Sequence, residues 1–205
     1  MKNTIVKDTL ILFLITLIAG FGLAAVYGLT KEPIAQADYN KQQNAYKTVF
    51  PDADQFVELP DFDSAEATAL SGCTNGDTVN GCVQAVGADG SLLGYVITVT
   101  DPNGYSGDIT FSMGVTLDGV LNGYSITTIN ETPGLGMKAK EAAFSDQFAG
   151  KTVESFTVTK SAPASDNEIQ AITGSTITSN AVTGGVNTGL AYYKELINIT
   201  GGELK

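Results

Sequence analysis

The first thirty residues carry the longest apolar stretch of the chain. Thr9 to Leu29 is 21 residues long and contains no charged side chain. A helix of this length can cross about 30 Å of hydrocarbon. The alternative is a cleaved signal peptide, but the apolar run continues past the poor small-residue cleavage site at residues 22–24. The pattern therefore predicts a transmembrane helix over residues 9–29, preceded by a short tail at residues 1–8.

Polar positions dominate the next sixty residues. The segment from Pro33 to Phe50 has the composition of a polar helix leading out of a membrane, and Pro51 is expected to stop it. We therefore predict a juxtamembrane helix over residues 30–50. Residues 51–90 are acidic, rich in turn-forming residues and without clear periodicity, so they predict no particular element.

From residue 91 onward the pattern becomes that of β-strands. Apolar residues alternate or run continuously over residues 92–100, 108–116 and 120–129, and the turn-forming segments PNGYSG and LDG separate these runs. Residues 152–160 (TVESFTVTK) alternate in the same way. The pattern therefore predicts four strands.

Two later segments show the spacing of amphipathic helices. Residues 138–148 predict a short helix ended by Gly150, and residues 180–196 carry apolar side chains three or four positions apart on one face. Strands followed by segregated helices indicate an α+β fold, in which helices pack on an antiparallel sheet. We place this folded domain at residues 91–197, followed by a C-terminal tail at residues 198–205.

The charge balance excludes several classes of function. The net charge is −11, all 11 basic residues are lysines, and histidine is absent. Nucleic-acid binding depends on cations that neutralise phosphates, so we expect none here. The lack of histidine removes Ser–His and Cys–His nucleophile pairs and the commonest transition-metal ligand. A bound cofactor is therefore the favoured source of any chemistry.

The two cysteines leave two possibilities open. Cys73 and Cys82 lie nine positions apart in a segment rich in Gly, Asn and Asp. Outside a cell such a pair can close a small disulfide loop, whereas two buried free thiols are the alternative. The spacing matches no zinc or iron–sulfur pattern, and we expect no metal site.

The charges that flank the apolar helix do not decide which way it crosses the membrane. Lys2 and Lys7 precede it, and Lys31, Lys41 and Lys47 follow it. The remainder of the chain is acidic, rich in hydroxyl side chains and carries the cysteine pair, as exported domains do. We therefore expect a single-pass protein of the cytoplasmic membrane with its soluble domain on the outer face.

The segment QAITGSTITSN at residues 170–180 is the strongest candidate for chemistry. Five hydroxyl side chains surround one glycine, directly before the predicted last helix. The glycine permits a tight turn and the close approach of a ligand, and Ser179 or Asn180 can cap the helix. Because a helix N-terminus binds phosphate without arginine, Thr176 or Thr178 could hold a small anionic group. A plain hydroxyl-rich helix cap is the alternative.

Three blocks of sequence together resemble the motifs of FMN-binding domains. TGSTITSNAV is similar to their flavin-attachment motif, commonly Ser/Thr-Gly-Ala-Thr-x-Thr/Ser, and NETPGLG at residues 130–136 resembles their Glu-Thr-Pro-Gly-Leu-Gly hallmark. PNGYSG at residues 102–107 is similar to a segment of the G subunit of Rnf electron-transport complexes. The three blocks occur in the order and spacing of that family. The C subunit of the sodium-pumping NADH:quinone reductase shares two of them, and the GYSG turn favours Rnf.

The resemblance implies FMN esterified through its phosphate to Thr176 by a dedicated flavin transferase. Ser175 stands where alanine is usual, and Gln170 stands where many members carry an aspartate that the transferase recognises. The residues that the resemblance implies at the flavin are Thr173, Gly174, Ser175, Thr176, Ile177 and Thr178 in the attachment motif, and Tyr105, Glu131, Thr132, Gly134 and Leu135 in the other two blocks.

The same resemblance implies the function of a membrane-anchored covalent flavoprotein. Such a protein carries electrons within a complex that couples ferredoxin:NAD electron transfer to the movement of Na⁺ or H⁺, and its partners are the other membrane and soluble subunits. The alternatives are a component like the C subunit of the quinone-reducing pump or a stand-alone extracellular flavin reductase. An anchored binding module without a cofactor is the alternative from another class.

Overall fold

A computed structural model describes the backbone of residues 2–199 and the side chains of residues 5–199. The chain divides into two units, Met1–Lys41 and Gln42–Lys205, and each is described by itself. The predicted tail at residues 198–205 falls outside the described residues from residue 200 onward.

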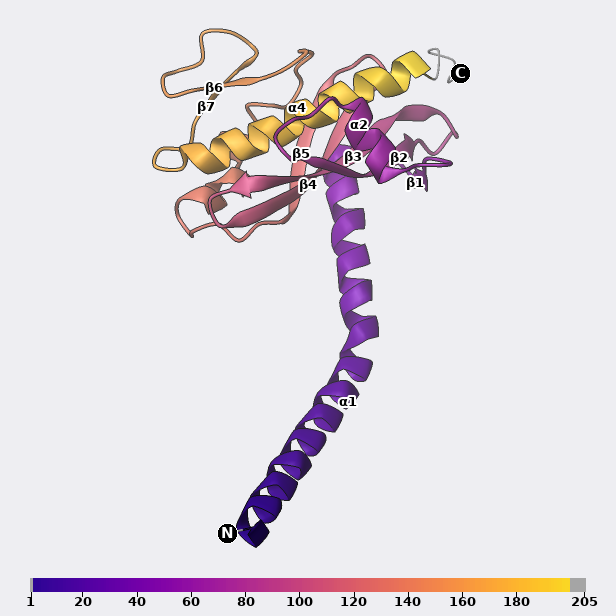
Figure 1. Ribbon diagram of the computed structural model, residues 1–205. Coiled ribbons are helices and arrows are strands. Elements are labelled where there is room, and N and C mark those ends of the chain that lie inside the picture. The colour runs from indigo at the N-terminus through magenta and orange to yellow at the C-terminus, as the bar shows by residue number, and fades with distance from the viewer. Residues whose placement is uncertain (1, 200–205) are drawn as a thin grey trace. The chain divides into compact units, whose positions relative to one another are not determined.

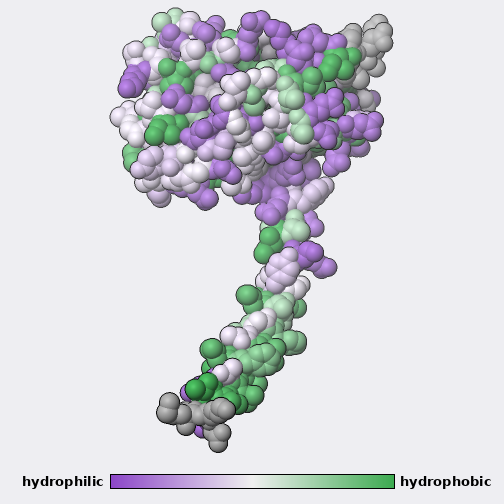
Figure 2. All heavy atoms as spheres, in the orientation of Figure 1, coloured by the Kyte–Doolittle hydropathy of each residue, from purple (hydrophilic) through white to green (hydrophobic). Residues whose placement is uncertain are grey.

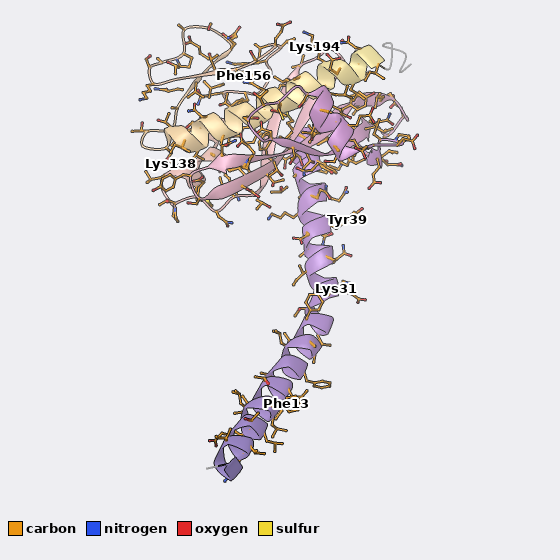
Figure 3. All side chains as sticks on the ribbon, viewed as in Figure 1. Phe13, Lys31, Tyr39, Lys138, Phe156 and Lys194 are labelled. Carbon is orange, nitrogen blue, oxygen red and sulfur yellow. The ribbon has the colours of Figure 1, made fainter. Side chains whose placement is uncertain are left out.

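The first unit consists of helix α1, which spans Lys2–Val49 and so continues into the second unit. The helices predicted over residues 9–29 and 30–50 are therefore one continuous element, and the predicted tail at residues 1–8 is helical from Lys2. Pro33 lies inside α1; a proline there removes one backbone hydrogen bond and favours a kink rather than two separate helices. The axis of α1 changes direction near Lys31 (Figure 3).

The apolar part of α1 is exposed all round, and hydrophobic side chains cover it in the space-filling view (Figure 2). Three threonines in or next to it donate hydroxyl hydrogen bonds to carbonyl groups of the preceding turn: Thr9 to Ile5, Thr16 to Phe13 and Thr30 to Val26, at 2.8–2.9 Å. Polar hydrogens satisfied in this way suit a hydrocarbon environment. By length and composition α1 can cross a membrane.

The second unit is built on a five-stranded sheet whose strands follow one another in sequence order (Figure 1). All neighbouring strands are antiparallel. This confirms the predicted antiparallel α+β architecture. The first three of the four predicted strands correspond to β3, β4 and β5. The strands are β1 (Gln55–Glu58), β2 (Thr78–Val86), β3 (Leu92–Gly104), β4 (Gly107–Thr116) and β5 (Leu121–Thr128).

The segment without clear periodicity, residues 51–90, supplies β1, β2 and helix α2 (Ser64–Leu70). The sheet therefore begins well before residue 91, where the sequence placed the start of the domain. In β2 a bulge between Val79 and Gly81 interrupts the alternation of side chains. The N-terminus of α2 did carry a usable signal, because the Asp63 side chain accepts a hydrogen bond from the Glu66 N–H at 2.8 Å.

The strand predicted over residues 152–160 is largely wrong. Only β6 (Thr157–Thr159) forms, and it pairs in parallel with β7 (Glu168–Gln170) in a separate two-stranded sheet. Just before β6, the backbone N–H and C=O of Phe156 are both bonded to the side-chain amide of Asn187, at 2.7 and 2.9 Å. A side chain of the last helix thus takes the place of a neighbouring strand.

Both predicted helices exist with altered bounds. Residues 138–148 form a 3₁₀-helix, η1 (Gly136–Lys140), and a short helix, α3 (Ala142–Ser145), because Glu141 between them is extended. The last helix, α4 (Thr176–Ile199), begins four residues earlier than expected. It lies across one face of the sheet, mainly over β3 (Figure 1).

The sheet is covered on both faces. On one face the predicted apolar stripe of α4 (Val182, Val186, Leu190 and Tyr193) packs into a core that includes Phe111 and Met113. On the other, the end of α1 and the residue after it, through Tyr46, Val49 and Phe50, cover Val83 and Val96. Coverage of both faces explains why β3 is apolar along its length rather than alternating.

Of the two possibilities left open for the cysteines, the structure has the free thiols rather than the disulfide. Cys82 points from β2 into the core, and burial raises the pKa of its thiol to about 12. Cys73 lies in the loop before β2, and its Sγ donates to the Asp77 carbonyl at 3.1 Å.

Candidate functional site

The three motif blocks meet at one pocket of about 490 Å³. They come from the turn between β3 and β4, the loop after β5, and the turn that leads into α4. The predicted site residues all line this pocket except Thr173 and Gly134. The lining residues are Tyr105, Glu131, Thr132, Leu135, Gly136, Gly174, Ser175, Thr176, Ile177 and Thr178.

The turn before α4 is held by its own hydroxyl groups. Gly174 has φ +80, a conformation that favours glycine, and the Ser175 N–H bonds to the Ile172 carbonyl at 2.9 Å. Ser179 Oγ accepts from the Ile172 N–H at 3.0 Å and donates to the Ser175 carbonyl at 2.9 Å. Ser179 therefore lies within the helix and stabilises the preceding turn through its side chain. The prediction that Ser179 or Asn180 caps the helix is wrong.

The start of α4 at Thr176 brings the attachment motif onto the helix N-terminus itself. The first N–H groups of a helix have no acceptor within it, and the helix dipole favours negative charge there. Thr176 is half-buried and Thr178 is buried, and both line the pocket. The arrangement is suited to a phosphate group, which needs no arginine at such a place.

Glu131 links the NETPGLG and PNGYSG blocks to the N-terminus of α4. It is only 6% exposed, and its Oε1 accepts from the Ser106 N–H, next to Tyr105, at 3.3 Å. A Cβ at Gly136 would lie 2.6 Å from Glu131 Oε2 and 2.7 Å from Thr178 Oγ1. Position 136 therefore admits only glycine if Glu131 and Thr178 are to stay close together.

Gly136 was absent from the predicted site residues. The signal for it is the second glycine of the PGLG block, which identifies a motif but no separate role for this glycine. The cost of any side chain there becomes visible only from the distances to Glu131 and Thr178.

The rim of the pocket is apolar and its floor is polar. Tyr105, Ile177 and Leu135 are 69%, 52% and 43% exposed, which is high for large apolar side chains beside a pocket. Glu131, Ser175 and Thr178 are buried beneath them. A flat aromatic ring system that also carries a phosphate matches this division, since the ring can pack on the rim and the phosphate can reach hydroxyl and N–H groups.

The two predicted residues that do not line the pocket lie close to it in sequence. Gly134 has φ +76 and lies in the turn closed by the Leu135 N–H bond to the Thr132 carbonyl at 3.1 Å. Thr173 lines a smaller cavity of about 240 Å³, together with Gln170 and Lys138. These two residues shape the site or its surroundings without facing the main pocket.

An antiparallel sheet crossed by a helix whose N-terminus carries this hydroxyl-rich turn, opposite a PGLG loop, defines the class of FMN-binding domains. The family model for the FMN-binding domain matches residues 104–191. A second model, the RnfG N-terminal region, matches residues 1–49, which contain α1.

Two relatives narrow the class to a family. The chain is 36% identical to the G subunit of the Na(+)-translocating ferredoxin:NAD(+) oxidoreductase complex of Acetobacterium woodii, over 95% of this chain and 94% of that protein. It is 33% identical to the G subunit of the proton-translocating ferredoxin:NAD(+) oxidoreductase complex of Clostridium ljungdahlii, over 98% and 97%. The chain belongs to the family of G subunits of ion-translocating oxidoreductase complexes, as the resemblance implied.

A solved structure shares the fold. The C subunit of the Na(+)-translocating NADH-quinone reductase from Parabacteroides distasonis matches 71% of this chain and 78% of its own length, with a TM-score of 0.51 and 21% identity. The likeness extends to the fold alone.

Proposed function

We propose that this chain is a membrane-anchored flavoprotein that carries electrons as the G subunit of an ion-translocating ferredoxin:NAD⁺ oxidoreductase complex. Its FMN would be joined through the phosphate to Thr176. The observation that carries the proposal is the meeting of three separate motif blocks at one pocket, on the N-terminus of α4. The relatives named as G subunits, matched over nearly their whole length, support the assignment to this complex.

When bound, FMN supplies the one- and two-electron chemistry that no side chain here can perform. The half-buried Thr176 would provide the oxygen for the phosphoester, and the N–H groups of the first turn of α4 would hold the remaining phosphate oxygens. Tyr105, Leu135 and Ile177 would pack against the flat ring and keep water from it. Glu131 brings a carboxylate into the pocket floor, where it disfavours added negative charge and so lowers the reduction potential.

The test of attachment compares three threonine variants of the full chain, each co-expressed with a flavin transferase. Thr176→Val should lose all covalent flavin because it lacks the reacting oxygen, while Thr173→Val should keep it, since Thr173 faces a different cavity. Flavin fluorescence on a denaturing gel and the intact mass measure the result. A fluorescent Thr176→Val band that disappears in Thr178→Val would move the attachment to Thr178.

The transferase itself is part of the proposal, because an ester to a threonine hydroxyl does not form unaided at a useful rate. Without the enzyme, the wild-type chain should show the mass of the bare polypeptide. If the wild type carried no flavin even with the transferase present, the alternative of an anchored module without cofactor would replace the proposal.

We further propose that the soluble domain lies on the outer face of the cytoplasmic membrane. A covalent bond retains the cofactor where no pool of free flavin can replace it, which favours this side; the free cysteines give no support. Lys138 and Lys160 are both exposed, so a membrane-impermeant amine reagent should label them in whole cells. Protection of both lysines until the cells are lysed would place the domain inside.

A further inference from the structure

Two carboxyl groups are buried together at a place that the FMN pocket does not use. Asp77 directly precedes β2 and Asp101 lies near the end of β3, and each is only 1% exposed. The neighbouring residues Thr78 and Thr100 are paired across the two strands, so the carboxyls come from adjacent strands of the sheet. The Asn75 amide, which bonds to Asp77 Oδ2, lies 3.3 Å from the place of a Cβ on Gly184, and Asp101 Oδ2 lies 3.2 Å from the same place, so the two carboxyls share one neighbourhood.

One oxygen of each carboxyl is fully supplied with donors. Asp77 Oδ2 accepts from Thr188 Oγ1 of α4 at 2.5 Å and from Asn75 Nδ2 at 3.0 Å. Asp101 Oδ1 accepts from the backbone N–H and the side-chain amide of Asn103, at 2.6 and 2.9 Å. These donors account for half of the oxygens in the pair.

The second oxygen of Asp77 has no such donor. Asp77 Oδ1 is buried and receives no hydrogen bond. Asp101 Oδ2 faces α4, where a Cβ on Gly184 would lie only 3.2 Å from it. A buried carboxylate oxygen without a donor costs about 1–3 kcal/mol or more, so this arrangement favours a further hydrogen-bond donor or positive charge at Asp77 Oδ1.

Within residues 5–199, nothing cationic supplies that charge. The loop before β2 contributes the Cys73 thiol, which bonds to the Asp77 carbonyl, and α4 contributes the uncharged Thr188, Gly184 and Gly185. The charged neighbour that acts on the pKa of Asp101 is Asp77, which is itself an acid. The one ion pair among these residues is formed by Lys194 and Glu154, and it involves neither carboxyl.

We propose that the Asp77–Asp101 pair is a proton-binding site, in which one proton shared between the two carboxyls fastens α4 to the sheet. The shared proton gives Asp77 Oδ1 the hydrogen bond that it otherwise lacks. Burial raises the pKa of Asp101 to about 6. The hydrogen bond from the Asn103 N–H opposes this rise, and the Asp77 charge adds to it. The proton is therefore held in mildly acidic conditions and released near neutrality.

The position of the pair connects this proton to the FMN pocket. Asp101 is followed within four residues by Tyr105, which lines the pocket, and Thr188 lies on the helix that begins at Thr176. Loss of the proton leaves two carboxylates in contact and weakens the link between these two segments. The inference does not depend on FMN, because it concerns the fold of the polypeptide itself.

The sign of the effect on stability follows from the raised pKa. The folded chain holds the proton up to about pH 6, whereas an unfolded aspartate loses it near pH 4. Between these values the folded state binds more protons, so the free energy of unfolding falls as pH rises and then levels off above the folded pKa. Asp101→Asn imitates the protonated carboxyl, because its amide can donate to Asp77 Oδ1 without titrating.

The test measures denaturant unfolding of the full chain in detergent from pH 4 to pH 8. Relative to Asp101→Asn, the unfolding equilibrium constant of the wild type should rise about 100-fold over this range, tenfold for each pKa unit of difference. The variant should therefore be the more stable protein at pH 7. Asp108→Asn removes an exposed aspartate and should keep the wild-type profile.

Parallel profiles for the wild type and Asp101→Asn would overturn the proposal. So would a wild-type chain whose stability at pH 7 is restored by Na⁺ or Ca²⁺ while Asp101→Asn does not respond, since the pair would then hold a metal cation. If Asp101→Asn fails to fold, carboxyl ¹³C NMR of the wild type decides the matter. One aspartate pair titrating near pH 6 supports the shared proton, and titration of every aspartate below pH 5 excludes it.

Discussion

Helices α1 and α4 are both rich in apolar and small residues, yet their sequences are constrained in opposite ways. In α1 the glycines Gly20, Gly22 and Gly28 have open space where a side chain would be. In α4 a Cβ at Gly185 would lie 2.9 Å from the Phe111 ring, and one at Gly189 would collide with Met113 Sδ. The first helix therefore depends on its total apolar character, and the second depends on which residue stands at each position.

The difference reflects what surrounds each helix. Hydrocarbon accepts any apolar side chain of any shape, so a membrane helix is selected by the sum of its transfer energies. A protein core is packed as densely as a crystal, so each added methylene must find space that is already filled. Three variants, each with a counterpart in the other helix or at the same position, test this contrast.

The largest effect is expected for Gly189→Leu in α4. The new side chain would collide with Met113, which is fully buried, and the free energy of unfolding of the domain should fall by about 3 kcal/mol or more. Gly22→Leu in α1 is the matched control and should leave domain unfolding unchanged. Equal stability of the two variants in denaturant titrations would show that the close approach of α4 to β4 is not a tight one.

A charge inside the apolar part of α1 should affect membrane insertion rather than the stability of the soluble domain. Leu17→Lys adds a cost of about 3 kcal/mol to membrane insertion, while the unfolding of the soluble domain should not change. The fraction of chain that stays with membranes after an alkaline wash measures the effect, with Leu17→Ile as the control. Full retention of the lysine variant would mean that residue 17 does not lie within the hydrocarbon of the membrane.

The smallest of the three effects is expected for a polar side chain. Asn187→Ala removes both bonds to the Phe156 backbone and should cost about 2 kcal/mol, because buried N–H and C=O groups are left without partners. Asn40 in α1 bonds only to the exposed Gln36, so Asn40→Ala should cost almost nothing. The comparison fails if both variants unfold at the same denaturant concentration.

Sequence reasoning succeeded where the signal is local. The uncharged run in α1 and the apolar runs of β3, β4 and β5 each identify their element without knowledge of the rest of the chain. The meeting of the three motif blocks at one pocket was predictable for a related reason, since the lining residues lie in compact stretches of sequence. The resemblance, rather than any physical rule, indicated that these blocks belong together.

It failed where the deciding partner is distant in sequence. Residues 152–156 have a strand pattern, but the backbone of Phe156 bonds to the Asn187 side chain of α4 instead of to a strand. Cys82 belongs to β2, whose bulge hides the strand pattern, so the segment read as a loop and the choice between a disulfide and free thiols stayed open. Asp77 and Asp101 come together only because β2 pairs with β3, and no local sequence pattern predicts that pairing.

The sequential order of the five strands has a consequence for how the molecule is made. Each strand pairs with the one that precedes it, so the sheet needs only short loop closures and can assemble while the chain is still emerging. Thr176 becomes part of the pocket only when α4, the last described element, has docked on β3. With the attachment proposed at Thr176, a flavin transferase would meet its complete target only after the domain has folded, and covalent flavin would mark chains that have completed folding.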